Sequence, residues 1–207
     1  MKRRTVILTA FIAVVLALGV LPALAQDANQ APERARGERT FPPAWMEESI
    51  EELRERLAER IASAEERIAA TDRLTEEEKA EALEELADAS AAFAAAEEKA
   101  ELVGIAISRR QLTRLEFRAE RRGETADYDA HIAGDLDRAN RRLEHTAKVA
   151  DWADAAGEDV AEVLPMLENA AGQLEVAKGG GTVEASHDAV HIALAWMAQA
   201  GVTLMGM

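Results

Sequence analysis

Between Ala44 and the C-terminus a single proline, Pro165, interrupts a sequence built almost entirely from helix-forming residues. Alanine accounts for 45 of the 207 residues, and charged residues account for 30%. Runs of β-branched and aromatic residues, which indicate strands, do not occur in it. Because proline is the strongest helix breaker, this stretch can form long helices joined by short loops. The sequence therefore predicts an all-α fold.

Apolar residues recur every three or four positions in this stretch, and interruptions of the pattern mark the ends of helices. The predicted helices span about residues 44–71, 76–122, 126–156, 158–178 and 183–200. At a rise of 1.5 Å per residue the second would be roughly 70 Å long, so we expect a bend or break near Val103 and Gly104. Pro165 should kink its helix or shift its start. Thr75 and Glu78 form a capping box that starts the second helix.

The predicted inward faces are rich in alanine, which allows helix axes to approach closely. On the first helix this face comprises Ile50, Leu53, Leu57, Ile61, Ala64 and Ile68. On the last helix it comprises Val183, Val190, Leu194 and Met197. Together with the short loops, these faces predict an elongated antiparallel helical bundle of about five or six helices within a domain spanning residues 44–207.

Two parts of the chain match at a separation of 81 residues. Leu83, Leu86, Ala89, Phe93 and Ala96 have apolar counterparts at Leu164, Leu167, Ala170, Leu174 and Ala177. A duplication would give two related helical hairpins, with halves at 44–122 and 126–207. The alternative is that any two alanine-rich amphipathic helices align this well.

The N-terminus has the three parts of a secretory signal peptide. Lys2, Arg3 and Arg4 precede an uncharged run over residues 6–21, and small residues follow at Ala23 and Ala25. We expect cleavage before Gln26 and a secreted, periplasmic or cell-envelope location. The alternative, an uncleaved anchor, would have to span the bilayer with sixteen apolar residues, fewer than the roughly 20 required.

Residues 26–43 are polar, contain three of the five prolines and lack apolar periodicity, so they predict a disordered leader. Removal of residues 1–25 leaves 21 basic and 39 acidic residues, a formal charge of −18. This charge disfavours nucleic acid and anionic membranes as partners, and no membrane span is expected after signal removal. The chain has no cysteine, so no disulfide supports the fold.

His187 and His191 form the most specific local pattern. Two histidines four residues apart lie one helical turn apart, and neutral imidazoles at this spacing can share a zinc, nickel or copper ion. His131, Asp135 or His145 from another helix could complete the site. The alternative is that both histidines are structural, with their second nitrogens hydrogen-bonded or hydrated.

The segment from His187 to His191 is similar to the HExxH motif of zinc proteases, but Asp188 stands in place of the glutamate. No acid, histidine or cysteine follows His191 to act as a third ligand, so protease activity is not expected. Ser186, His187 and Asp188 are adjacent on one helix and point in different directions, which argues against a catalytic triad. Met197, Met205 and Met207 could suit Cu(I), although a core or tail position explains them better.

Four arginines recur at helical spacing and form a basic stripe in an acidic protein: Arg110, Arg114, Arg118 and Arg121. Guanidinium groups bind carboxylates and phosphates in a bidentate manner, so the stripe is a candidate partner-binding surface. The alternative is that neighbouring acidic residues neutralise it within the molecule. The sequence thus predicts an exported, non-enzymatic interaction or scaffold protein with an envelope or extracellular partner. The alternative function is metal binding at His187 and His191.

Overall fold

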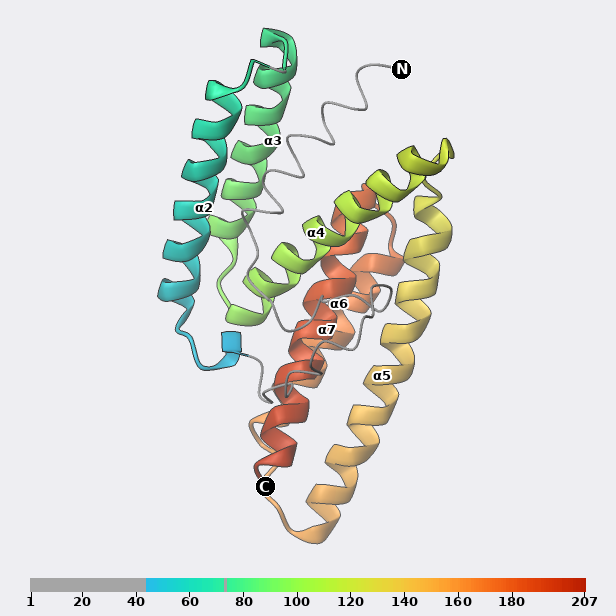
Figure 1. Ribbon diagram of the computed structural model, residues 1–207. Helices are drawn as coiled ribbons and strands as arrows, with labels where there is room; N and C mark the ends of the chain where they lie inside the picture. Colours follow the sequence, from blue (N-terminus) through green and yellow to red (C-terminus); the bar gives the residue numbers. More distant parts are fainter. Residues whose placement is uncertain (1–43, 73) are drawn as a thin grey trace, which may run out of the picture.

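The computed structural model describes residues 44–72 and 74–207, and it confirms the all-α prediction (Figure 1). This part of the chain contains one short 3-10 helix, six α-helices and no strand. Consecutive helices run in opposite directions and form an elongated bundle. The elements are η1 (Ala44–Met46), α2 (Ile50–Ala70), α3 (Glu76–Ala95), α4 (Lys99–Arg122), α5 (Tyr128–Ala156), α6 (Val163–Lys178) and α7 (Val183–Met205).

The predicted signal peptide and leader, residues 1–43, lie outside the described residues, so both stay predictions. Among the helices that are described, none has the length and apolar content needed to cross a bilayer.

Two capping boxes set the N-termini of α2 and α3. The predicted box at Thr75 and Glu78 is present, with the Thr75 hydroxyl accepting from the backbone N–H of Glu78. A second box joins Ser49 to Glu52 and starts α2 at Ile50, so the predicted start at Ala44 is wrong. All the predicted inward residues of α2 beyond Ile50 are buried.

The long predicted helix over 76–122 is broken, but not where the sequence suggested. The break lies at residues 96–98, where the carboxylate of Glu101 accepts hydrogen bonds from the backbone N–H groups of Glu97 (2.8 Å) and Glu98 (3.0 Å). These bonds satisfy amide donors that the start of α4 would otherwise leave unpaired. The predicted break near Val103 and Gly104 is wrong, because both residues lie within α4.

Gly104 marks the place where α4 crosses α7. A Cβ atom added to Gly104 would lie 2.4 Å from the Cα atom of Ile192 and 2.5 Å from its backbone nitrogen. The two backbones are therefore in direct contact, and a glycine is required there because a side chain would overlap α7.

Helix α7 is the central element of the bundle and packs against α4, α5 and α6. Val190 and Met197 are 1% exposed, as predicted for its inward face. In all, eleven residues of α7 are buried, and they are spread around the helix. The buried surface of α7 is therefore wider than the single face that the sequence predicted. A helix that neighbours surround on several sides buries more than one stripe. The helix also continues to Met205, beyond the predicted end near Ala200.

The boundaries of α5 and α6 differ from the prediction for local reasons. Asp127 caps α5 by accepting from the backbone N–H of Ala130, so the helix begins at Tyr128, two residues after the predicted start. Helix α6 begins at Val163, so Pro165 lies in its first turn. Proline is tolerated there because amide groups of the first turn have no partner within the helix. The prolyl residue therefore shifts the helix start, which is one of the two predicted outcomes.

The proposed duplication has partial parallels in the structure. The counterparts Leu86 and Leu167, and likewise Phe93 and Leu174, are all buried at 9% exposure or less. Helix α7 packs closely on its own hairpin, whereas α4 packs mainly on α7 and only slightly on α3. The duplication, and the domain halves based on it, stay predictions.

Candidate metal centre

The centre of the site is His187 on α7, which is 1% exposed. Its ring stacks between two other imidazoles, at 5.4 Å from the ring centroid of His131 and 5.1 Å from that of His191. His131 comes from α5, and His191 lies one turn further along α7. The contact between α5 and α7 therefore gathers three of the four histidines of the chain.

Three side chains at this contact place potential ligand atoms close together. Potential ligand atoms of His131, Asp135 and His187 all lie within 4.8 Å of one another. Ligands of one zinc ion lie about 2.0–2.2 Å from it, which places them roughly 3–4 Å apart. To bind one ion, the three side chains would have to rotate toward one another, because the rings of His131 and His187 are stacked at an interplanar angle of 14°.

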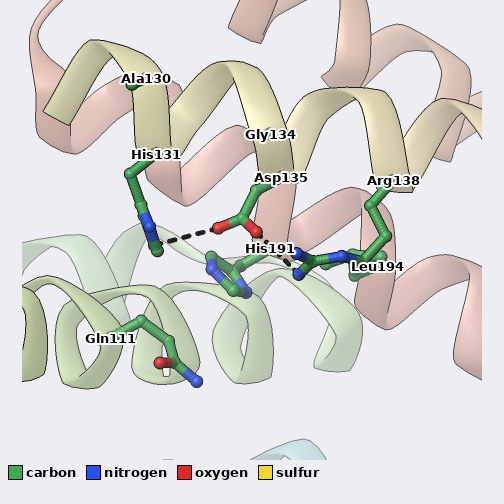
Figure 2. A pocket seen from close by; sticks show the side chains of 8 residues that line it. All are labelled: Gln111, Ala130, His131, Gly134, Asp135, Arg138, His191 and Leu194. Carbon is green, nitrogen blue, oxygen red and sulfur yellow. Dashed lines mark hydrogen bonds and ion pairs between the residues drawn. The ribbon is translucent and has the colours of Figure 1, made fainter. Parts of the chain in front are cut away.

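Asp135 is held in place from both sides (Figure 2). Its Oδ2 atom lies 3.2 Å from His131 Nε2, and its Oδ1 atom accepts a hydrogen bond of 2.8 Å from Arg138 Nη1. All three residues lie on α5 at spacings of three or four, and the Asp135 side chain is only 11% exposed. Arg138 thereby orients the carboxylate that would bind the metal. Residues that hydrogen-bond to metal ligands usually have this role.

Three buried imidazole nitrogens have no hydrogen-bond partner among the described residues. These atoms are both ring nitrogens of His187 and the Nε2 atom of His191. Burial, followed by the charge of His131, lowers the pKa of His187, while Asp135 opposes the shift. Burial, and next His187, lowers the pKa of His191 to about 4. Both rings are therefore neutral at pH 7, the form in which imidazole binds metals.

A cavity of about 270 Å³ opens onto this cluster. Helix α5 contributes His131, Asp135 and Arg138, helix α7 contributes His191, and α4 contributes Gln111 (Figure 2). The His131 side chain is 38% exposed, so the cluster is open to solvent on this side.

The structure distinguishes among the residues proposed from the sequence. His187 joins His131 and Asp135, two of the three proposed partners from another helix. His191 stacks against His187 but is not part of this three-residue group, and His145 is exposed on α5 away from it. The spacing of four between His131 and Asp135 is the same signal that singled out His187 and His191. Arg138 and Gln111, which line the cavity, were not predicted from the sequence as site residues.

The neighbours of His187 have separate roles. Asp188 points to α4, where its Oδ2 atom lies 3.2 Å from Arg109 Nη2. Among the described residues, Asp188 therefore pairs with Arg109 and not with the adjacent His187. Met197 is buried in the core at 1% exposure, whereas Met205 and Met207 are 63% and 42% exposed.

The arginine stripe is divided along α4. Arg110 and Arg114 are half-buried and each interacts with other groups of the protein, and burial lowers the pKa of the Arg110 guanidinium. Arg118 and Arg121 are exposed, and the guanidinium carbon of Arg121 lies 5.4 Å from the ring centroid of Phe117. Only the C-terminal half of the stripe is thus fully presented to solvent.

A second cavity, of about 340 Å³, is acidic and is bordered by α3, α4 and the first turns of α5 and α7. Its lining comprises Glu85, Asp88, Arg109, Leu112, Glu116, Tyr128 and Glu184. The Tyr128 hydroxyl donates a hydrogen bond of 2.7 Å to Glu116. Burial, and next the negative charges of Glu116 and Glu81, raise the pKa of Glu85 to about 7, against the opposing charge of Arg109.

The raised pKa of Glu85 predicts a pH-dependent gain from Glu85→Gln. In the unfolded chain the carboxyl ionises near its ordinary value, so the wild-type protein loses stability as pH rises from about 4.5 to 7. The neutral amide avoids this loss. After allowance for solvent screening, we expect Glu85→Gln to raise the free energy of unfolding by about 1–2 kcal/mol at pH 8 and by little at pH 4.5.

Urea denaturation at the two pH values measures this difference. Glu84→Gln, at an exposed neighbouring position, is the control and should change stability little at either pH. An equal gain from Glu85→Gln at pH 4.5 and pH 8 would contradict the role of ionisation.

Comparison with known protein families, curated proteins and solved structures found no match. The fold and the side-chain geometry define the class of this protein: an all-α helical bundle with a histidine–aspartate cluster between two of its helices.

Proposed function

We propose that this protein binds a divalent transition-metal ion through His131, Asp135 and His187. One observation carries the proposal: ligand atoms of these three side chains, from two helices, lie within 4.8 Å of one another around a buried imidazole. Metal sites in helical bundles are commonly built in this way, from side chains on facing helices.

The energetics of His187 favour a ligand role over a structural one. A buried polar atom without a partner costs about 1–3 kcal/mol, and among the described residues both nitrogens of His187 are in this position. A structural histidine normally has at least one hydrogen bond. A metal ion would accept a lone pair from one nitrogen and offset this cost.

The donor set indicates the class of metal. Two imidazole nitrogens and one carboxylate oxygen suit zinc, nickel or copper in the divalent state. Thioether ligands would favour Cu(I), but the methionines near the C-terminus are either in the core or exposed. Zn²⁺ is the first ion to test, since it binds tetrahedral sites with these ligands.

Thermal unfolding of the metal-free protein with added metal tests the proposal. An ion at 100 times its dissociation constant stabilises the folded state by about 2.7 kcal/mol. For a domain of this size, the expected rise in Tm is roughly 5–10 °C with Zn²⁺, Ni²⁺ or Cu²⁺. His187→Ala and Asp135→Asn should each abolish most of this rise.

His145→Ala is the matched control, because His145 is an exposed histidine on the same helix as His131. It should leave the metal-induced rise unchanged. If none of the three ions changes Tm, or if His145→Ala removes the effect as completely as His187→Ala, the proposed site is wrong.

The predicted role as an exported, non-enzymatic interaction protein is compatible with this proposal and stays a prediction. The exposed Arg118 and Arg121, beside a Phe117 ring that is 39% exposed, are the part of the stripe available to a partner. We place metal binding first because it depends on side chains whose ligand atoms already lie within 4.8 Å of one another, whereas half of the stripe interacts within the molecule.

A further inference from the structure

The cavity beside the histidine cluster faces the same atoms that would hold the metal. His131 and Asp135 line the cavity, whereas His187 does not line it and is 1% exposed. An ion held by these three residues would have its remaining coordination position directed toward the cavity. Sites with three protein ligands and one open position bind an exchangeable water or substrate there.

The charges around the cavity determine whether an anion or a cation binds there more favourably. A divalent ion, the Asp135 carboxylate and the Arg138 guanidinium together carry two net positive charges, since histidine binds a metal ion in its neutral form. Gln111 adds an uncharged amide on the α4 side of the cavity (Figure 2). An anion is therefore favoured over a cation at this position.

Arg138 has hydrogen-bond donors to spare for such an anion. Its Nη1 atom donates to Asp135 Oδ1, but a guanidinium has five N–H donors, and the Arg138 side chain is 72% exposed. Guanidinium groups bind oxyanions in bidentate fashion. The volume of about 270 Å³ is enough for a small anion and a few waters, each of which takes about 30 Å³.

We infer that the metal-bound protein takes a small oxyanion, a carboxylate or a phosphate, as an exogenous ligand at the cavity-facing coordination position, with Arg138 as its second contact. This inference rests on the proposed metal site. It extends that proposal from a metal-binding protein to one whose metal ion is accessible to a small anionic ligand.

The full chain loaded with Co²⁺ tests the inference, since visible absorption of bound Co²⁺ reports changes in its ligands. Acetate and inorganic phosphate are titrated separately at constant ionic strength, which distinguishes a carboxylate ligand from a phosphate ligand. We expect a saturable spectral change with at least one of them. Arg138→Gln should weaken anion binding by about threefold to tenfold, as expected for the loss of one partly exposed charged contact.

Because Arg138 also orients Asp135, the cobalt affinity of Arg138→Gln is measured first and the anion is titrated at full cobalt occupancy. Arg142→Gln, at an exposed position on the same helix, is the control and should bind the anion like the wild type. A cobalt spectrum that neither anion changes overturns this inference while the proposed metal site stands. Absence of any bound cobalt overturns the metal site and the inference together.

Discussion

Replacement of Gly104 by alanine is expected to lower the free energy of unfolding by about 3 kcal/mol or more, or to prevent folding altogether. The added Cβ would lie 2.4 Å from the Cα atom of Ile192. The contact is with backbone, which cannot rotate away as a flexible side chain can. Helix α4 would have to move away from α7, along the contact that joins α4 to the rest of the bundle.

Gly172→Ala is the matched control, because Gly172 lies inside α6 and a Cβ atom added there would meet no other atom within 4 Å. Alanine forms helices better than glycine, so this variant should be more stable than the wild type by up to about 1 kcal/mol. Urea denaturation of both variants measures the contrast. A Gly104→Ala protein as stable as Gly172→Ala would show that α4 and α7 do not cross as closely as described.

Local sequence patterns predicted the buried face of one helix correctly but misplaced the break between two others. Local periodicity identified the buried face of α2, since each of its residues from Leu53 to Ile68 follows the helical repeat. It misplaced the break between α3 and α4, because residues 96–98 contain no glycine or proline. The glycine that looked like a break is instead required by a contact with a helix 88 positions further along the chain.

The candidate site was predictable in part for a similar reason. The spacing of His187 from His191, and of His131 from Asp135, is visible in the sequence as two pairs of potential ligands. The sequence does not reveal which part of α5 faces His187, because this depends on how α5 and α7 are aligned. His145 lies 14 residues beyond His131, about 21 Å further along α5, and this distance excludes it from the site.

Replacement of His187 by leucine is expected to stabilise the metal-free protein, by about 1–2 kcal/mol at pH 7.5. Leucine has a similar volume and no polar atoms, so it removes two buried nitrogens that have no hydrogen-bond partner among the described residues. Some of the gain is offset by the loss of stacking on His131 and His191. Asp135 keeps its contact with Arg138, so the substitution leaves no unpaired buried charge.

The gain in stability from His187→Leu should increase as pH falls. The pKa of His187 is lowered in the folded protein, so below its ordinary value the unfolded chain binds the additional proton and the wild type loses stability. Leucine cannot titrate, and the difference between the variant and the wild type should therefore be larger at pH 5.5 than at pH 7.5. Urea denaturation with a chelator present measures it, with His145→Leu at an exposed position as the control.

The same variant should lose the metal-induced rise in Tm, and this combination is what separates a ligand from a structural residue. Sites that evolve for binding often retain groups that destabilise the free protein, so removing such a group raises stability and abolishes binding together. A histidine that serves the fold would behave in the opposite way. If His187→Leu lowers the stability of the metal-free protein at both pH values, His187 is a structural residue and the assignment of the site fails.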